Sequence, residues 1–207
     1  MGQDVEWLFF DLGSTLIDES ECYRRRILRM INGTGVRYEE FYRVMTDFYR
    51  QGQKGDRLAA KQYGFTLPPW ESEWESLYPD AKRCLERLAG KYRLGVIANQ
   101  NIGTVQRLRA FGIDRYFDVV IASAEEGLAK PNPAIFRLAL HRAGCLPSQA
   151  GMVGDRLDND IAPANLLGMT TFRVMRGFGS LAVPAKPEEI PDFTVNDLDA
   201  LCELLLK

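Results

Sequence analysis

Short apolar runs alternate with stretches of helical periodicity along most of this chain, and this alternation limits the possible folds more than any other feature. The apolar runs predict strands at residues 6–11, 92–98, 117–122, 151–154 and 170–174, with a weaker candidate at 193–195. Between them, segments 80–89, 104–111 and 133–143 place apolar side chains on one helical face. Such alternation predicts βαβ units, and therefore an α/β fold with a doubly wound, Rossmann-like parallel sheet.

Residues 16–78 interrupt this pattern, because no second strand is predicted there after the first one. The periodicity instead predicts helices at 19–31, 38–51 and 54–63, and half of the chain's aromatic residues lie in this segment. We therefore expect a small helical subdomain with its own core, inserted after the first strand. The α/β core is expected to comprise residues 1–15 and 79–207.

Composition excludes several classes of protein. The chain has 207 residues, 46% of them hydrophobic and 26% charged, which is ordinary for a globular protein. A net charge of −2 gives no support for nucleic-acid binding. No apolar run approaches the ~18 residues of a membrane span, and residues 1–11 lack the pattern of an export signal. We therefore expect a cytoplasmic protein without a nucleic-acid or membrane partner, and the oligomeric state stays open.

Polar residues follow the predicted strands at the ends where a parallel sheet binds its ligands. These residues are Asp11, Gly13 and Ser14 after the first strand, Asn99 and Gln100 after the second, Lys130 after the third, and Asp155 and Asp160 after the fourth. The carboxyl ends of parallel strands meet along one edge of the sheet. We therefore expect two carboxylate clusters, a lysine and an amide-rich turn to converge in one cleft.

This set of residue types suits phosphoryl transfer. Carboxylates from different strands repel each other unless a cation lies between them, and Mg²⁺ is commonly held by carboxylates together with phosphate oxygens. A lysine supplies a positive charge for phosphate, and side-chain amides or backbone N–H groups donate to phosphoryl oxygens. A carboxylate can itself be the nucleophile. With one histidine in the chain, His141, a catalytic triad built on histidine is not expected.

Four stretches, in this order, resemble the haloacid dehalogenase-like hydrolase superfamily: LFFDLGSTLID, GVIANQN, EEGLAKPNPAIF and MVGDRLDNDIAPANLLGM. The resemblance covers essentially the whole chain and is closest to the subgroup with a helical cap inserted after the first strand. It implies that residues 16–78 are that cap. It also implies a Mg²⁺-dependent hydrolase that acts on a small phosphorylated substrate.

The resemblance assigns a role to each candidate residue. It implies that Asp11 is the nucleophile and that Lys130 pairs with Asp11 and the substrate phosphate. By the same resemblance, Asp155 and the backbone carbonyl of Gly13 hold Mg²⁺ beside Asp11, and Asp160 supports that metal site. Phosphate contacts are expected from Ser14, Asn99, Gln100 and Lys130. We interpret Asp158 as the N-cap of a helix at 159–167.

Two positions depart from the family pattern. Phosphatases of this family usually carry a second Asp two residues after the nucleophile as general acid and then base, whereas Gly13 stands there. Asp18 is near enough in sequence to substitute, although a solvated role for it is the simpler interpretation. The hydroxyl residue that usually precedes Asn99 is replaced by Ala98.

The resulting hypothesis is a phosphatase that forms an aspartyl-phosphate intermediate on Asp11. Two alternatives remain open. One is a 2-haloacid dehalogenase, in which Asp11 attacks carbon and no metal is needed. The other is a degenerate, non-catalytic family member that binds a ligand, which the glycine at position 13 suggests.

Overall fold

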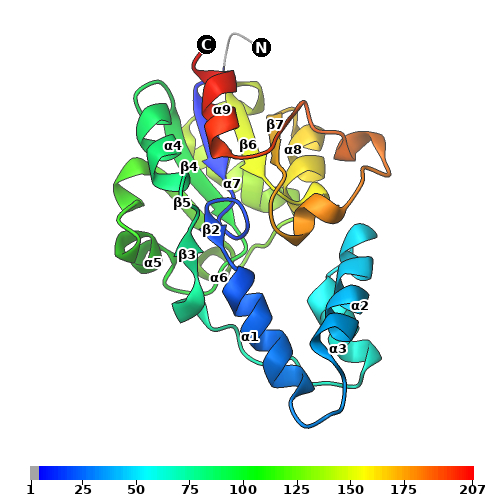
Figure 1. The fold of residues 1–207 in the computed structure, drawn as a ribbon. Helices are drawn as coiled ribbons and strands as arrows, with labels where there is room; N and C mark the ends of the chain where they lie inside the picture. Colours follow the sequence, from blue (N-terminus) through cyan, green and yellow to red (C-terminus); the bar gives the residue numbers. More distant parts are fainter. Residues whose placement is uncertain (1–4) are drawn as a thin grey trace.

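A six-stranded, fully parallel β-sheet forms the centre of the molecule in a computed structural model that describes residues 5–207 (Figure 1). The strands lie in the order β5-β4-β1-β6-β7-β8. Their bounds are β1 Trp7–Phe10, β4 Arg93–Ala98, β5 Val119–Ala122, β6 Ala150–Gly154, β7 Thr170–Val174 and β8 Phe193–Val195. The predicted α/β fold and all six predicted strands are confirmed.

Helices cover both faces of this sheet. On one face lie α4 (Ala81–Leu88), α5 (Thr104–Ala110) and α9 (Leu198–Leu205), and on the other lie α7 (Pro133–Ala143) and α8 (Ala162–Leu167), while the short α6 (Ser123–Glu126) follows β5. Strand β1 shows why both layers form. Leu8 and Phe10 point into the first layer, and Trp7 and Phe9 point into the second. A strand buried on both faces must be apolar at every position.

The order of the strands reverses at β1. The chain passes from β1 to β4 and β5 on one side, and then crosses to β6, β7 and β8 on the other. In open parallel sheets, ligands bind beyond the carboxyl ends of the strands at such a switch point. Asp11, which directly follows β1, therefore occupies the position at which a ligand is expected.

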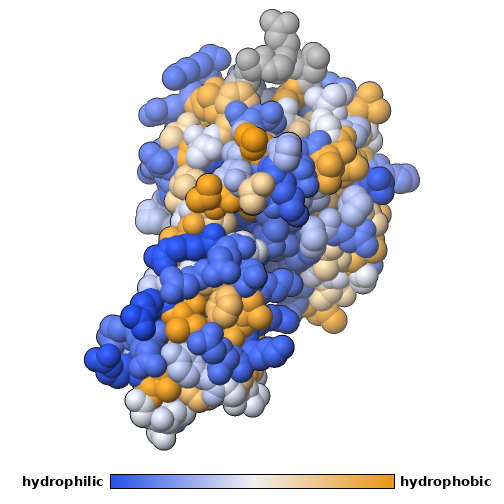
Figure 2. All heavy atoms as spheres, turned by 90° about the vertical axis from the view of Figure 1, so that its right-hand side faces the viewer, coloured by the Kyte–Doolittle hydropathy of each residue, from blue (hydrophilic) through white to orange (hydrophobic). Residues whose placement is uncertain are grey.

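Three helices lie at the carboxyl-end side of the sheet, as a separate group (Figure 1). They are α1 (Ser20–Ile31), α2 (Tyr38–Arg50) and α3 (Gly55–Gln62), and they share a hydrophobic cluster centred on Phe41 and Met45. Their bounds confirm the three predicted helices. Figure 2 shows a mainly hydrophilic surface where this group meets the body of the molecule. No helix within residues 5–207 is both long and apolar enough to cross a membrane.

The prediction that residues 16–78 contain no strand is wrong at both ends of the segment. Two short antiparallel strands, β2 (Ile17–Asp18) and β3 (Ser76–Leu77), pair where the chain leaves the sheet body and where it returns. Two residues per strand are too few to produce an alternating pattern in the sequence. The pairing ties the entry and exit of the helical segment together.

The connection between β7 and β8 reaches the helical segment through Phe178. The Phe178 ring stacks on Tyr49 with centroids 4.8 Å apart, and it packs edge-on against Tyr23 at 4.8 Å and tilted against Tyr42 at 5.8 Å. These three tyrosines come from α1 and α2. The helical segment is therefore held against the sheet body by aromatic contacts as well as by the β2–β3 pair.

Asp80 joins three parts of the chain beside β3. Its carboxylate accepts two hydrogen bonds from the guanidinium of Arg176 and one from the backbone N–H of Leu198, at 3.0 Å. Burial by itself raises the pKa of the Asp80 carboxyl, but the hydrogen bonds and positive charge of Arg176, together with the hydrogen bond from Leu198, outweigh burial. The pKa of Asp80 therefore lies below its ordinary value.

Gly95 provides a test of the packing around β1. It lies opposite Phe9 in the sheet, and a Cβ at Gly95 would be 2.6 Å from the Phe9 ring. We expect Gly95→Ala to lower the free energy of unfolding by about 1–3 kcal/mol, because overpacking forces a buried ring to shift. Chemical denaturation measures the difference. The control is Gly90→Ala, whose nearest atom would be 3.8 Å away; equal stabilities of the two variants would contradict the prediction.

Asp80 provides a pH-dependent test of stability. A carboxyl whose pKa is lowered in the folded state stabilises the fold above its unfolded value of ~4 and loses this contribution as the pH falls through the folded value. We expect Asp80→Asn to cost about 2 kcal/mol at pH 7 and progressively less below about pH 4. Denaturation curves of both proteins across this pH range measure it. A difference that does not change with pH would contradict the assignment.

Candidate active site

Lys130 lies at the centre of the cleft and contacts carboxylates from two different loops. Its Nζ is 2.8 Å from Oδ1 of Asp11 and 2.5 Å from Oδ1 of Asp160. The Lys130 side chain is 1% exposed and that of Asp160 is fully buried, whereas 13% of Asp11 stays exposed. Burial lowers the pKa of the Lys130 ammonium, but the negative charges of Asp11 and Asp160 raise it by more. The pKa of Lys130 therefore lies above its ordinary value. Lys130 therefore stays charged.

Asp155 completes a cluster of three carboxylates. One oxygen of each of Asp11, Asp155 and Asp160 lies within 4.8 Å of the others. Both oxygens of Asp160 are occupied, because Oδ1 contacts Lys130 and Oδ2 accepts the backbone N–H of Arg156 at 3.0 Å. Within residues 5–207, Asp155 has no ion-pair partner. Burial raises the pKa of Asp155 well above its ordinary value, and the charges of Asp160 and Asp11 add to this.

This cluster fits a divalent cation. Three carboxylates face one ammonium group, so the buried site carries an excess of negative charge that a cation would neutralise. Hard oxygen ligands are the set that Mg²⁺ prefers. Because Asp160 is engaged on both oxygens, Asp11 and Asp155 have the oxygens that are free to bind a metal.

Two glycines allow the acidic side chains to enter this space. A Cβ at Gly179 would lie 2.1 Å from Oδ2 of Asp155, and a Cβ at Gly154 would lie 2.5 Å from Cγ of Asp160. The carbonyl of Gly179 in turn accepts a hydrogen bond from the buried guanidinium of Arg173, at 2.8 Å. The loop that carries Phe178 and Gly179 is thus fixed against Asp155. Arg173 is not recognisable from the sequence, because a cation inside a buried strand has no local signal.

Asn99, a predicted phosphate contact, lines the cleft and binds the backbone of Lys130. Its side-chain nitrogen donates to the Lys130 carbonyl at 2.9 Å, and its side-chain oxygen accepts the Lys130 backbone N–H at 2.8 Å. Asn99 therefore fixes the loop on which Lys130 stands. The side-chain oxygen of Gln100 accepts a hydrogen bond from Arg107, and Gln100 lines the cleft.

The predicted phosphate contact Ser14 faces a residue that sequence analysis did not consider. Its hydroxyl donates to Oε2 of Glu19 at 3.2 Å, and its backbone N–H donates to the Ile17 carbonyl at 2.8 Å. Ser14 has a left-handed backbone with φ of 56°, which is uncommon for a residue other than glycine. Burial raises the pKa of Glu19 to about 8, and the charges of Asp11 and Glu75 contribute.

Asp18 and Asp158 are two further acidic residues near the cleft to which the sequence suggested a role. Asp18 accepts the backbone N–H of Ser20 at 2.8 Å, at the start of α1. The prediction that Asp158 caps a helix at 159–167 is wrong, because its carboxylate instead binds the guanidinium of Arg156. Residues Leu157–Ile161 form a π-helical turn, so α8 begins only at Ala162. Because the Asp158 carboxylate pairs with Arg156, two residues earlier in the chain, it does not cap a helix.

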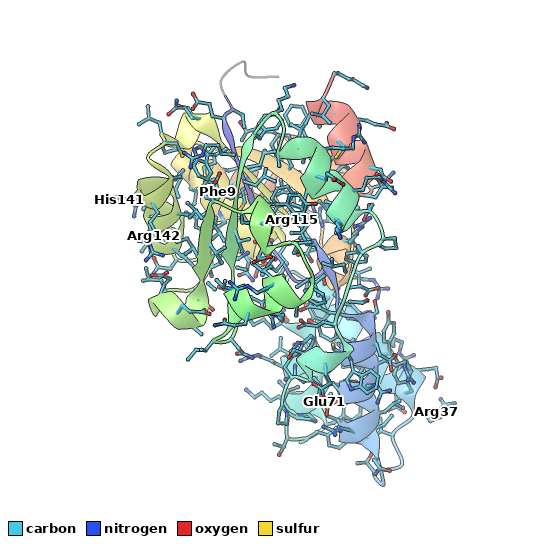
Figure 3. The ribbon with its side chains drawn as sticks, turned by 90° about the vertical axis from the view of Figure 1, so that its left-hand side faces the viewer. Phe9, Arg37, Glu71, Arg115, His141 and Arg142 are labelled. Carbon is cyan, nitrogen blue, oxygen red and sulfur yellow. The ribbon has the colours of Figure 1, made fainter. Side chains whose placement is uncertain are left out.

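The site opens into cavities between the sheet body and the three helices. A cavity of about 140 Å³ is lined by Asp11, Lys130, Asp155 and Glu19, among others. It shares Glu19 and Tyr23 with two adjoining cavities of about 380 and 430 Å³. The only histidine of the chain, His141, lies on the exposed side of α7 and away from these cavities (Figure 3).

Residues 5–168 match the family model described as haloacid dehalogenase-like hydrolase. The chain belongs to this family. A glyceraldehyde 3-phosphate phosphatase of Methanopyrus kandleri is 31% identical, over 93% of each chain. A phosphoserine phosphatase of Thermus thermophilus is 35% identical over 59% of this chain and 48% of its own.

Solved structures of the haloacid dehalogenase-like family share the fold. A predicted phosphoglycolate phosphatase from Haemophilus somnus superposes with a TM-score of 0.72, at 25% identity and over 97% of each chain. Membership confirms the family resemblance in the sequence and makes this chain a hydrolase. The family match ends before β7, so it includes every predicted site residue and leaves out the Phe178 loop.

Lys130 provides a test of the charge balance in this haloacid dehalogenase-like site. We expect Lys130→Met to lower the free energy of unfolding by about 3–5 kcal/mol, because two carboxylates stay buried without their cation. The control is Lys61→Met, at an exposed position of α3. Its free energy of unfolding should stay within about 0.5 kcal/mol of the wild-type value. Urea denaturation of both variants measures the effect. A Lys130→Met variant as stable as its control would show that the carboxylates do not need this ammonium group.

Proposed function

We propose that this chain is a Mg²⁺-dependent phosphatase of a small phosphorylated metabolite, with Asp11 as the nucleophile. The observation that carries the proposal is the convergence of Asp11, Lys130 and Asp155 beside the carboxyl end of β1. Of the two Asp11 oxygens, Oδ1 contacts Lys130, and Asp11 is the more exposed of the two carboxylates that pair with Lys130. This exposure, and the position of Asp11 in the cavity lining, support Asp11 as the group that meets the substrate.

The mechanism begins with attack by an Asp11 oxygen on phosphorus, in line with the leaving oxygen. This step forms an aspartyl-phosphate and releases an alcohol, and attack by water on phosphorus then restores the Asp11 carboxylate. Lys130 neutralises charge on the phosphoryl oxygens and orients Asp11 through their 2.8 Å contact. Asp160 acts through Lys130 by holding its ammonium group from the opposite side.

A magnesium ion would be held by Asp11 and Asp155, with the Gly13 carbonyl as a further oxygen ligand. When bound, it supplies positive charge to the phosphoryl oxygens as negative charge develops on them. Asp155 supports this assignment, because it is buried, lacks an ion-pair partner within the described residues and lies next to the Asp11 carboxylate.

The three helices of residues 16–78 serve in this proposal as a cap that selects the substrate. They line the two larger cavities with tyrosine and arginine side chains, among them Tyr42 and Arg26. A closed cap excludes water from the phosphoryl group before Asp11 attacks. The names of the relatives, which include phosphatases of glyceraldehyde 3-phosphate and phosphoserine, favour a small metabolite as the substrate.

Asp11 provides the direct test of the proposal. We expect the protein to hydrolyse p-nitrophenyl phosphate only with Mg²⁺, and Asp11→Asn to lower kcat/KM by more than about 10³-fold because the nucleophile is lost. Release of p-nitrophenolate measures the rate. The matched control is Asp118→Asn, which removes an exposed carboxylate from the surface of the sheet body and should leave the rate unchanged.

Two results would contradict the proposal. Full activity of Asp11→Asn would exclude Asp11 as the nucleophile. Activity that persists in excess chelator would exclude the metal, and halide release from a 2-haloacid would then identify a dehalogenase. Mg²⁺ binding by a folded protein without hydrolysis of any phosphate ester would identify a non-catalytic member of the family.

A further inference from the structure

The carboxyl group of Glu19 fills the space in which a side chain at residue 13 would lie. A Cβ built on Gly13 would be 2.6 Å from Oε1 of Glu19 and 2.8 Å from its Cδ. Both distances are shorter than real Cβ contacts, so a larger residue at 13 and this position of Glu19 exclude each other. Glycine at position 13 therefore leaves room for a carboxyl group that comes from residue 19.

The position of Glu19 is not explained by helix capping. Glu19 is the N-cap residue of α1, yet its side chain makes no capping hydrogen bond. Asp18 contacts the first turn instead, by accepting the backbone N–H of Ser20. The Glu19 side chain turns toward the cleft, where the hydroxyl of Ser14 donates to its Oε2 at 3.2 Å.

Glu19 also lines the space around the proposed nucleophile. It lines the cavity that contains Asp11 and Lys130, and it lines both larger cavities beneath the three helices. In-line attack by Asp11 requires the leaving oxygen to point away from Asp11 and toward the cap. A carboxyl that lines all three cavities can meet that oxygen.

On the basis of the phosphatase function proposed above, we infer that Glu19 is the general acid and base that position 13 does not supply. As the bond from phosphorus to the leaving oxygen breaks and the bond to Asp11 forms, the carboxylic proton of Glu19 moves to the leaving oxygen. The products are an alcohol, the aspartyl-phosphate and the Glu19 carboxylate. Water then attacks phosphorus, the bond to Asp11 breaks, and a proton of that water returns to Glu19.

The dependence of the rate on the leaving group tests this role. A proton donor matters for phenyl phosphate, whose leaving group is a poor one, and matters little for 2,4-dinitrophenyl phosphate, whose leaving group is stable as an anion. The values of kcat/KM for both esters are compared among wild type, Glu19→Gln and the control Glu21→Gln. Glu21 is an exposed carboxylate two residues further along, where it pairs with Arg24 and Arg25.

We expect Glu19→Gln to lower kcat/KM for phenyl phosphate by about 10²-fold or more, and for the dinitrophenyl ester by less than about 10-fold. The Glu21→Gln control should match wild type on both esters. If Glu19→Gln does not fold, Glu19→Ala serves for the same comparison. An equal loss on both esters, or no loss on either, would overturn the role of Glu19.

Asp11→Asn, measured in parallel, separates failure of this inference from failure of the phosphatase function. Wild-type activity that requires Asp11, together with an equal effect of Glu19→Gln on both esters, overturns only the role of Glu19. A wild type that hydrolyses neither ester, or an active Asp11→Asn variant, overturns the phosphatase function and this inference with it.

Discussion

The ammonium group of Lys130, buried between the carboxylates of Asp11 and Asp160, is the interaction on which the site depends. Three buried carboxylates at one edge of a sheet repel each other strongly, and one lysine neutralises only part of that charge. Asn99 holds both backbone groups of Lys130, so the ammonium group is directed into the cluster. The remaining negative charge explains why a divalent cation belongs in the proposed mechanism.

The architecture makes this arrangement possible by placing the reversal of strand order at β1. The carboxyl ends of β1, β4 and β6 meet there, and each is followed by one part of the site. The connection after β5 supplies Lys130, and the connection from β7 to β8 adds a further part, because Gly179 admits Asp155 while Phe178 contacts tyrosines of the three-helix segment. The same loop therefore packs against Asp155 and holds the three-helix segment beside the cleft.

Glycine at position 13 and glutamate at position 19 are best understood together. A single missing carboxylate suggests weak or absent catalysis when it is considered alone. In the folded chain, the missing side chain leaves a space that another carboxyl group fills. In the proposed role of Glu19, the chemistry of the site is kept while the residue that supplies it changes, because the new residue reaches the same space.

The fold and most of the site were predictable from the sequence, because apolar strands buried on both faces and polar residues directly after them are local patterns. Asp11 and Asp155 directly follow β1 and β6, and Lys130 and Asp160 lie further along the connections after β5 and β6; the structure brings all four together. The contact between Glu19 and Gly13, the buried Arg173 and the β2–β3 pair were decided only by tertiary structure. Each depends on side chains or strands brought together by the path of a loop, and two-residue strands or a lone buried charge leave no periodic signal. The sequence determined which groups reach the edge of the sheet, and the folded loops decided which of them share a space.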